Sequence, residues 1–410
     1  MSAETPRAIN FGAGPSCLPD SVLKEAAAGL FNFAGSGIGI AEISHRSKEF
    51  TTFLTEVESL IREQLNVPST HSILFAQGGG TGQFAAVVLN MLARHRLLHP
   101  EVADSERTID YVLTGSWSKA AVKEATRLTA NSQVKINIAA DGKAHSTDGK
   151  SYESIPPHDS YTFSQDPALI YYCENETVDG VQFSNDEGDA SSFPFHLLPK
   201  DKLLPLVADY SSSFMSRPIP RLADHAIIYA GAQKNIGPAG LTIIIVRQDC
   251  IVDVDAAVAL GSTPVPSVLS YKYLADGKSV PNTPPVFSLY VAGLVLRRMK
   301  TLGGLAYFLE TNRKKQEKVY AAVREGEARG VFVPRVKEGS RSWMNIVFNV
   351  PGDGAEGKFL AGAEKRGMKG LKGHRSVGGI RVSLYNALEE EQVDRIVQYM
   401  REFIEESTTL

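Results

Sequence analysis

One lysine, Lys234, lies in a turn of small and polar residues between two β-branched apolar runs, in the segment IIYAGAQKNIGPAGLTIIIVR. Lysines are seldom buried, so most residues of this type are surface charges. Here, apolar strands on both sides would desolvate the ammonium and lower its pKa toward that of an amine nucleophile. A desolvated lysine in a ligand cleft commonly forms a Schiff base with a carbonyl, and pyridoxal phosphate is the foremost cofactor of that kind. The segment therefore predicts a site for this cofactor.

A pyridoxal phosphate site also needs a carboxylate, which keeps the pyridine nitrogen protonated so that the ring can act as an electron sink. Asp209 ends the apolar run LLPLVAD, and the residues between it and Lys234 suffice for one crossover and one strand. This spacing would bring both side chains to the same edge of a sheet. Taken alone, Asp209 is equally well explained as the N-cap of the next helix.

The cofactor's phosphate needs backbone N–H groups at a helix N-terminus, and its ring needs an aromatic side chain to lie against. The stretch QGGGTGQFAAVVLN offers Gly80 and Thr81 ahead of a predicted helix, although it has neither a Walker lysine nor the GxGxxG spacing. Trp117 follows a strand end in TGSW. Read singly, these features are explained as well or better by an ordinary turn and a core tryptophan. Their combination with Lys234 and Asp209 favours the cofactor site.

The elements that must hold these residues repeat a pattern of apolar strand, short turn and helix. Continuous apolar strands joined by helical crossovers are typical of a mostly parallel sheet with helices on both faces. The candidate residues follow the C-terminal ends of predicted strands, and in open α/β sheets that edge binds ligands. We therefore predict an α/β fold with its site at this edge.

Other segments lead to further structural expectations. Helices are predicted over 18–33 and 50–67, and a long helix follows the proline-rich turn SVPNTPP. The acidic, turn-rich segment 185–200 is predicted to be a surface loop. Since single cores rarely grow beyond about 250–300 residues, we expect a large domain over 21–305 and a small domain made of 1–20 and 306–410.

Composition excludes several other classes of protein. The chain has 410 residues and a formal net charge of −3, so it has no overall electrostatic attraction to nucleic acid or to anionic membranes. Its three cysteines lie far apart without CxxC spacing, which argues for a reducing compartment and against disulfides or a zinc site. Apolar runs such as LTIIIV are too short to span a membrane, and the N-terminal residues show no targeting pattern. We expect a cytoplasmic protein that binds no metal.

The chain resembles the phosphoserine aminotransferase family, a branch of the class V enzymes with the type I fold of pyridoxal phosphate proteins. The resemblance covers nearly the whole chain and is carried most specifically by AGAQKNIGPAG and KGHRSVGGIR, with support from ENETVDGVQF, VADYSSSFMSRP and PNTPP. It implies a homodimer with shared active sites, whose large domain contains a mostly parallel seven-stranded sheet. It also implies reversible transfer of an amino group from L-glutamate to 3-phosphohydroxypyruvate, which gives 2-oxoglutarate and O-phospho-L-serine in L-serine biosynthesis.

The same resemblance gives each candidate residue a role toward the cofactor. Lys234 holds it through the Schiff base and transfers protons, Asp209 pairs with the pyridine nitrogen, and Trp117 stacks on the ring. Thr177 hydrogen-bonds near the ring hydroxyl. The phosphate is held by Gly80, Thr81 and Gln233 of one subunit together with Asn282 and Thr283 of the partner subunit.

Both substrates carry two anionic ends, so the site also needs clustered cations, and guanidinium groups suit carboxylate and phosphate best. Runs of basic residues are usually solvated surface charge. However, the glycines of KGHRSVGGIR indicate a tight loop in a slightly acidic chain. The resemblance implies an anion site made from His45, Arg46, His374, Arg375 and Arg381, in which His45 has either an anion-binding or a packing role.

Three alternatives compete with this interpretation. A cysteine desulfurase needs a mobile thiolate of low pKa in a late loop, and no cysteine follows Cys250. A transaminase of non-phosphorylated keto acids such as glyoxylate would not require the cations at 372–381. A P-loop nucleotide-binding protein built on GGGTGQ would leave Lys234 unexplained and lacks the Ser or Thr that binds Mg²⁺.

Overall fold

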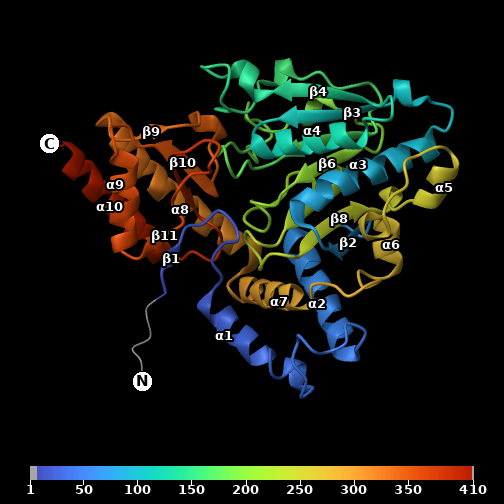
Figure 1. The fold of residues 1–410 in the computed structure, drawn as a ribbon, viewed down its shortest axis with the longest axis horizontal. Coiled ribbons are helices and arrows are strands. Elements are labelled where there is room, and N and C mark those ends of the chain that lie inside the picture. The colour runs from blue at the N-terminus through green and yellow to red at the C-terminus, as the bar shows by residue number, and fades with distance from the viewer. Residues whose placement is uncertain (1–6, 409–410) are drawn as a thin grey trace.

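The computed structural model describes residues 7–408 and contains a central sheet of seven strands covered by helices on both faces (Figure 1). The strand order is β2-β8-β7-β6-β5-β3-β4, and only β8 is antiparallel to its neighbours. The strands are β2 His71–Ala76, β3 Thr108–Leu113, β4 Lys135–Asp141, β5 Leu169–Cys173, β6 Leu206–Asp209, β7 His225–Gly231 and β8 Thr242–Arg247. This sheet confirms the predicted α/β fold with a mostly parallel seven-stranded sheet.

Helices enclose a separate hydrophobic core on each face of this sheet. They are α1 Asp20–Gly29, α2 Lys48–Leu65, α3 Gly79–Leu98, α4 Ser116–Leu128, α5 Val254–Ala259, α6 Tyr271–Asp276 and α7 Val286–Thr301. In β7, Ile227 packs in the core shared with α3 and α4, whereas its neighbour Ile228 packs in the core shared with α1, α2 and α7. Burial on both faces explains why the strand sequences are continuous apolar runs.

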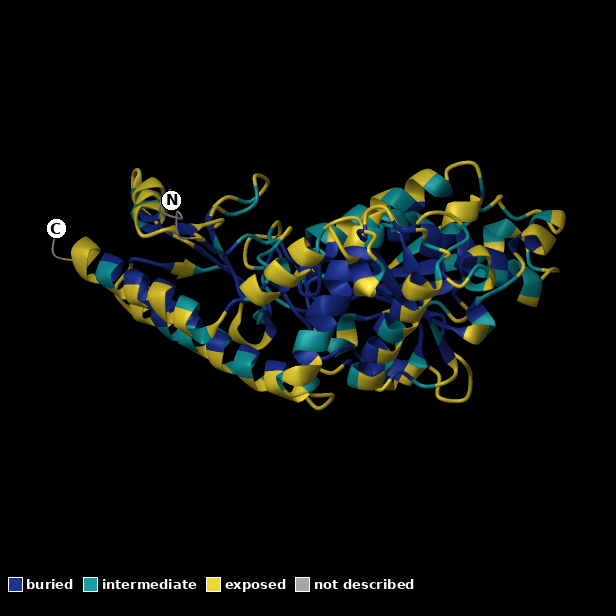
Figure 2. Ribbon diagram, turned by 90° about the horizontal axis from the view of Figure 1, so that it is seen from below, coloured by how far each residue is buried: buried dark blue, intermediate teal, exposed yellow. Residues whose placement is uncertain are grey.

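A third core occupies the C-terminal part of the chain. It is enclosed by α8 Gly304–Ala328, α9 Ala355–Lys365, α10 Glu390–Thr408 and the antiparallel strands β9 Val333–Pro334, β10 Asn345–Asn349 and β12 Ile380–Ser383. Strand β1 Ile9–Asn10 pairs in parallel with β11 Met368–Lys369 and so attaches the N-terminal segment to this core. Figure 2 shows buried residues along the strands and inner helix faces, with exposed residues outside. The domain limits at 20/21 and 305/306 stay a prediction.

Two predicted helices differ from the observed ones. The first ends at Gly29 rather than at residue 33. The expected long helix after the proline-rich turn is divided into α7 and α8, because the chain turns at Gly303 and Gly304. Both glycines have positive φ angles of +111° and +65°, which other residues adopt only with strain. None of the helices over residues 7–408 is both long and apolar enough to cross a membrane.

The prediction that 185–200 is a surface loop is wrong for residues 191–195. Residues 186–188 are exposed, but 191–195 are buried. Phe193 stacks on Tyr172 of β5 with a centroid distance of 4.3 Å, and Phe195 lies 4.9 Å from Phe193. The acidic first half dominated the composition of the segment and concealed two aromatic residues that complete the core beneath the sheet.

Candidate active site

A cavity of about 180 Å³ lies where the C-terminal ends of β5, β6 and β7 meet the N-termini of α3 and α4. Parallel α/β sheets bind ligands at this edge. The cavity is lined by all seven residues that the resemblance assigns to the cofactor within one chain, namely Gly80, Thr81, Trp117, Thr177, Asp209, Gln233 and Lys234. Residues separated by more than 150 positions in the sequence therefore converge on one space.

Lys234 lies in the turn between β7 and β8 and is only 9% exposed. Its Nζ donates a hydrogen bond of 3.2 Å to Oγ1 of Thr177. Burial and the positive charge of Arg381 lower its pKa to about 8, against the opposing effect of the Asp209 carboxylate. Part of this amine is therefore unprotonated near neutral pH, and the unprotonated form can attack a carbonyl or accept a proton.

The N-terminal segment closes over Lys234. Gly14 has a φ of +129°, and a Cβ at this position would lie 2.9 Å from Cδ of Lys234. Ser16 donates its backbone N–H to the carbonyl of Gln233 at 2.9 Å and its hydroxyl to the carbonyl of Lys234. Sequence reasoning assigned neither residue a role, although the glycine before proline in GAGPS was an available signal of a close approach.

Asp209 is the last residue of β6 and is 6% exposed. Its Oδ1 accepts the backbone N–H of Ser211 at 2.8 Å. Burial raises its pKa, while hydrogen bonds from Ser211 and Tyr229 and the charge of Lys234 oppose that rise. A buried carboxylate of this kind can form a strong charge-assisted hydrogen bond with a protonated ring nitrogen.

The N-terminus of α3 forms another wall of the cavity. Gly78 and Gly79 have φ angles of +100° and +62°, which allow the sharp turn from β2 into the helix. A Cβ on Gly80 would lie 3.7 Å from both Oδ2 of Asp209 and Oγ of Ser211. Since the first N–H groups of a helix have no intrahelical acceptor, the backbone of Gly80 and Thr81 can bind a phosphate.

These groups fit pyridoxal phosphate, which is a flat pyridine aldehyde that carries a phosphate. Lys234 offers an amine, Asp209 a carboxylate, and α3 an anion-binding N-terminus beside them. Trp117 offers an indole whose buried Nε1 has no hydrogen-bond partner among the described residues. The cavity therefore offers groups suited to the aldehyde, the ring nitrogen, the phosphate and the aromatic ring of the cofactor.

Arg381 lies next to this cavity, whereas His374 and Arg375 lie in the loop before it. The Nη1 of Arg381 donates to the carbonyl of Thr177 at 3.1 Å, and burial lowers the pKa of its guanidinium. His374 contacts Oγ of Ser376 at 2.7 Å, and burial together with the charges of Arg381 and Arg375 lowers its pKa. Arg375 is exposed. The two guanidinium groups and the His374 imidazole therefore form one group, with Arg381 at its inner end.

The structure does not bring the remaining candidates to the cavity of the same chain. Arg46, Asn282 and Thr283 are exposed, and none of them lines the cavity. Nε2 of His45 is buried without a hydrogen-bond partner among the described residues. The carbonyl of Thr283 accepts a hydrogen bond of 2.8 Å from the side chain of Gln77, which precedes the glycines of α3.

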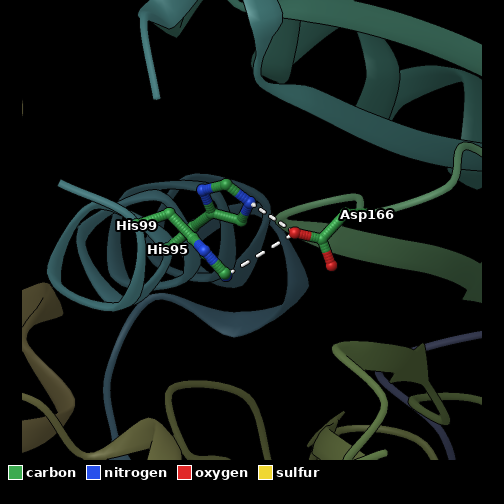
Figure 3. Close-up of side chains that lie close together, drawn as sticks. All are labelled: His95, His99 and Asp166. Carbon is green, nitrogen blue, oxygen red and sulfur yellow. Dashed lines mark ion pairs between the residues drawn. The ribbon is translucent and has the colours of Figure 1, made fainter. Parts of the chain in front are cut away.

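A second cluster of titratable side chains, His95, His99 and Asp166, lies outside this cavity (Figure 3). Nε2 of His95 and Nε2 of His99 lie 3.7 and 3.5 Å from Oδ2 of Asp166. Arg107 donates a hydrogen bond to Nδ1 of His95. Because arginine has no acceptor atom, this bond places the proton of a neutral His95 on Nε2. A metal ion requires a lone pair at that atom, so the donor set does not suit a metal.

The known proteins that this chain resembles match nearly its whole length. The family model described as aminotransferase class V matches residues 8–396. The phosphoserine aminotransferase of Hahella chejuensis (strain KCTC 2396) is 40% identical over 399 residues, which cover 97% of this chain and 98% of that protein. The solved phosphoserine aminotransferase of Bacillus circulans subsp. alkalophilus is 33% identical with a TM-score of 0.84, covering 98% of this chain and 100% of that one. The PLP-bound phosphoserine aminotransferase of Trichomonas vaginalis is 34% identical with a TM-score of 0.81, covering 96% and 100%.

Proposed function

The chain belongs to the class V aminotransferase family and uses pyridoxal phosphate, and from this premise we propose that it is a phosphoserine aminotransferase. The reaction is the reversible transfer of the amino group of L-glutamate to 3-phosphohydroxypyruvate, and the products are 2-oxoglutarate and O-phospho-L-serine. This reaction serves L-serine biosynthesis, which we place in the cytoplasm.

One observation carries the proposal. Lys234 is a buried amine with a lowered pKa of about 8, and it shares one cavity with the buried carboxylate of Asp209 and the N-terminus of α3. Isolated buried lysines are rare because burial of a charged ammonium is costly. Its position at the ligand-binding edge of the sheet is therefore functional rather than structural.

Pyridoxal phosphate, when bound, supplies an aldehyde that binds the substrate's amino group and an electron-withdrawing ring that stabilises negative charge at the substrate carbon carrying that group. Lys234 holds the cofactor and, once released, takes and returns the proton at that carbon. Asp209 keeps the proton on the ring nitrogen. Trp117 orients the ring, and Thr177 contacts both the Lys234 amine and, through its carbonyl, Arg381.

The substrates' anionic ends require cations on the open side of the cavity. Arg381 is held by the carbonyl of Thr177 and lies near Lys234, so it is placed to bind the end closest to the reacting carbon. We propose that His374, Arg375 and Arg46 bind the distal anion, which is the phosphate of one substrate and the side-chain carboxylate of the other. Guanidinium groups bind both kinds of anion through paired hydrogen bonds.

A homodimer accounts for the candidates that do not line the cavity of their own chain. Arg46, Asn282 and Thr283 are exposed in the single chain. Because they lie outside its cavity, they do not contact an anion bound there. We propose that Asn282 and Thr283 of the partner subunit complete the phosphate site, as the exposed loops of a two-fold dimer can do.

The structure also bears on the alternative functions. Cys173 lines the cavity, but it ends β5, and burial raises its pKa well above the ordinary value. A desulfurase needs the opposite, a mobile cysteine of low pKa. In the P-loop alternative, Gly80 would face a nucleotide, whereas here it faces the carboxylate of Asp209 and the hydroxyl of Ser211.

Product analysis tests the proposal directly. Purified enzyme with L-glutamate and 3-phosphohydroxypyruvate should yield equal amounts of 2-oxoglutarate and O-phospho-L-serine. Lys234→Ala should reduce turnover by at least about 10²–10⁴-fold, the range expected for loss of a general base. If wild-type enzyme prefers glyoxylate or hydroxypyruvate over the phosphorylated acid, the substrate assignment is wrong.

A further inference from the structure

The first turn of α4 carries Trp117 and has an unusual source of hydrogen-bond acceptors. Helices usually begin with a Ser, Thr, Asp or Asn whose side chain caps the first N–H groups. The residue before α4 is Gly115, which has no side chain to do so. The amides of this turn must therefore find acceptors elsewhere, because buried N–H groups are almost always paired.

Two carboxylates from the turn after β5 supply these acceptors. Oε2 and Oε1 of Glu176 accept the backbone N–H groups of Trp117 at 2.7 Å and Ser118 at 2.8 Å. Oδ2 of Asp179 accepts the N–H of Ser116 at 2.6 Å. Three consecutive amides are thus held by side chains roughly 60 residues away in the sequence. Burial raises the pKa of both carboxyl groups, that of Glu176 to about 8, while the hydrogen bonds from these amides and the helix dipole favour the charged forms.

Glu176 is fully buried, and its approach depends on the absence of a side chain at Gly115. A Cβ on Gly115 would lie 2.4 Å from both Cγ and Cδ of Glu176. The φ of Gly115 is 178°, which any residue can adopt, so backbone strain does not require a glycine here. The glycine is instead needed to let the carboxylate lie against the helix end.

The same turn also contacts the reactive lysine. Thr177 follows Glu176 directly, and its Oγ1 accepts a hydrogen bond from Nζ of Lys234. The carbonyl of Thr177 accepts from Arg381. One short segment after β5 therefore holds the backbone of Trp117 on one side and the Lys234 amine and Arg381 guanidinium on the other.

We infer that Glu176 is a positioning residue. It fixes the Trp117 indole against the pyridoxal phosphate ring and sets the position of that indole relative to the Lys234 amine. This inference rests on the proposed use of the cavity, but it concerns a contact that exists in the protein itself. Glutamine at this position keeps one carbonyl acceptor and presents an NH₂ group to the second amide, so one hydrogen bond becomes a contact between two donors.

Tryptophan fluorescence tests the inference without reference to catalysis. The chain has two tryptophans, so Trp343→Phe leaves Trp117 as the single reporter. In that background, Glu176→Gln should expose Trp117 to acrylamide quenching, shift its emission to longer wavelength, and speed hydrogen exchange of the 116–118 amides. The affinity for pyridoxal phosphate should fall by roughly tenfold, as expected for loss of a buried hydrogen bond. Glu176→Asp keeps both oxygens and should recover part of each signal.

Asp110→Asn is the matched control. Asp110 is fully buried on β3 and accepts the backbone N–H of Ser164 at 2.7 Å, but no hydrogen bond or ion pair joins it to α4 in the described structure. It should alter stability while leaving Trp117 emission and cofactor affinity unchanged. The inference is overturned if Glu176→Gln keeps the emission and affinity of the Trp343→Phe protein, or if Asp110→Asn reproduces the changes expected of Glu176→Gln. Tryptophan emission and hydrogen exchange are measured without substrate. They therefore still test the role of Glu176 if a different keto acid proves to be the substrate.

Discussion

At the scale of single residues, the site depends on an amine kept away from water and placed between opposite charges. Lys234 is surrounded by Thr177, Asp209 and Arg381, and the last two act on its pKa in opposite directions. Burial is the largest cause that lowers this pKa to about 8 from the 10.5 of an ordinary lysine, and the charge of Arg381 adds to it while that of Asp209 opposes it. Burial and the two charges together set how much reactive amine is present at neutral pH.

This pKa predicts the pH dependence of Lys234 in the cofactor-free enzyme. A lowered lysine pKa means that the neutral, reactive amine accumulates as pH rises through about 8. The rate of labelling of Lys234 by pyridoxal phosphate and borohydride, followed by peptide mapping, should therefore reach half its maximum near that pH. Labelling of another lysine, or a midpoint at the ordinary lysine value of 10.5, would contradict the assignment.

Two substitutions should move this midpoint in opposite directions. Arg381→Gln removes a positive charge that lowers the Lys234 pKa, so the midpoint should rise. Asp209→Asn removes a negative charge that raises the pKa, so the midpoint should fall. The same labelling assay measures both shifts; the absence of both would show that burial alone controls the amine, and shifts of equal sign would contradict the roles given to the two charges.

Arg375 should determine the preference for a phosphorylated substrate. It is exposed in a glycine-rich loop beside His374, where a phosphate could be bound without much further desolvation. Arg375→Ala should lower the ratio of kcat/KM for 3-phosphohydroxypyruvate over hydroxypyruvate by roughly 10–100-fold, the value of one charge-assisted hydrogen-bonding group. Arg366→Ala, which removes an arginine paired with Glu402, should leave this ratio unchanged. If both variants behave alike, the loop contributes only surface charge.

At the scale of elements, the glycine turn before α3 separates the anion-binding helix end from the carboxylate at the end of β6. Gly80 is the residue of this helix end that faces Asp209, and because it has no side chain, the space in front of the Asp209 carboxylate stays open. Its conformation is helical, since α3 begins one residue earlier. The glycine is therefore required for access to the cavity rather than for the turn.

Gly80→Val should close this space without unfolding the protein. We expect the affinity for pyridoxal phosphate to fall by at least about tenfold, because the added methyl groups occupy volume next to Asp209 and Ser211. Gly357→Ala is a suitable control, since a Cβ there meets no atom within 4 Å. Titration of the cofactor absorbance and thermal melting measure affinity and stability separately. Unchanged affinity in Gly80→Val would remove α3 from the phosphate site.

At the scale of the whole molecule, the single chain brings Lys234 and Asp209 into one cavity but leaves three of the proposed anion-binding residues outside it. Arg46, Asn282 and Thr283 face solvent, while the cavity lies elsewhere on the chain. A two-fold dimer resolves this arrangement if each chain lends its exposed loops to the other chain's cavity.

Subunit complementation tests the shared site. Lys234→Ala inactivates the cavity of its own chain, and Thr283→Glu places a negative charge where the partner's phosphate would bind. Mixed dimers of the two variants contain one intact site, so random mixing should restore about a quarter of wild-type activity. Mixing Lys234→Ala with Asp209→Ala should restore none, because both residues line the cavity of their own chain. If Thr283→Glu fails to complement, Thr283 acts within its own chain.

The sequence by itself determined the sheet and the residues that follow its strands. Strands such as β7 and β8 are buried on both faces, so their positions in the chain are visible as apolar runs. Lys234 and Trp117 are identifiable just beyond such runs, and Asp209 at the end of one. Such patterns are local, since they depend on neighbours along the chain.

Only the tertiary structure decided which loops contact one another across the site. Gly14 against Lys234, Glu176 at the start of α4, and the burial of Phe193 all join segments that are distant in sequence. None of these contacts repeats with a helical or strand period, and the acidic residues beside Phe193 suggested a loop at the surface. Their partners follow from the packing of helices on the sheet in three dimensions, which no single segment encodes.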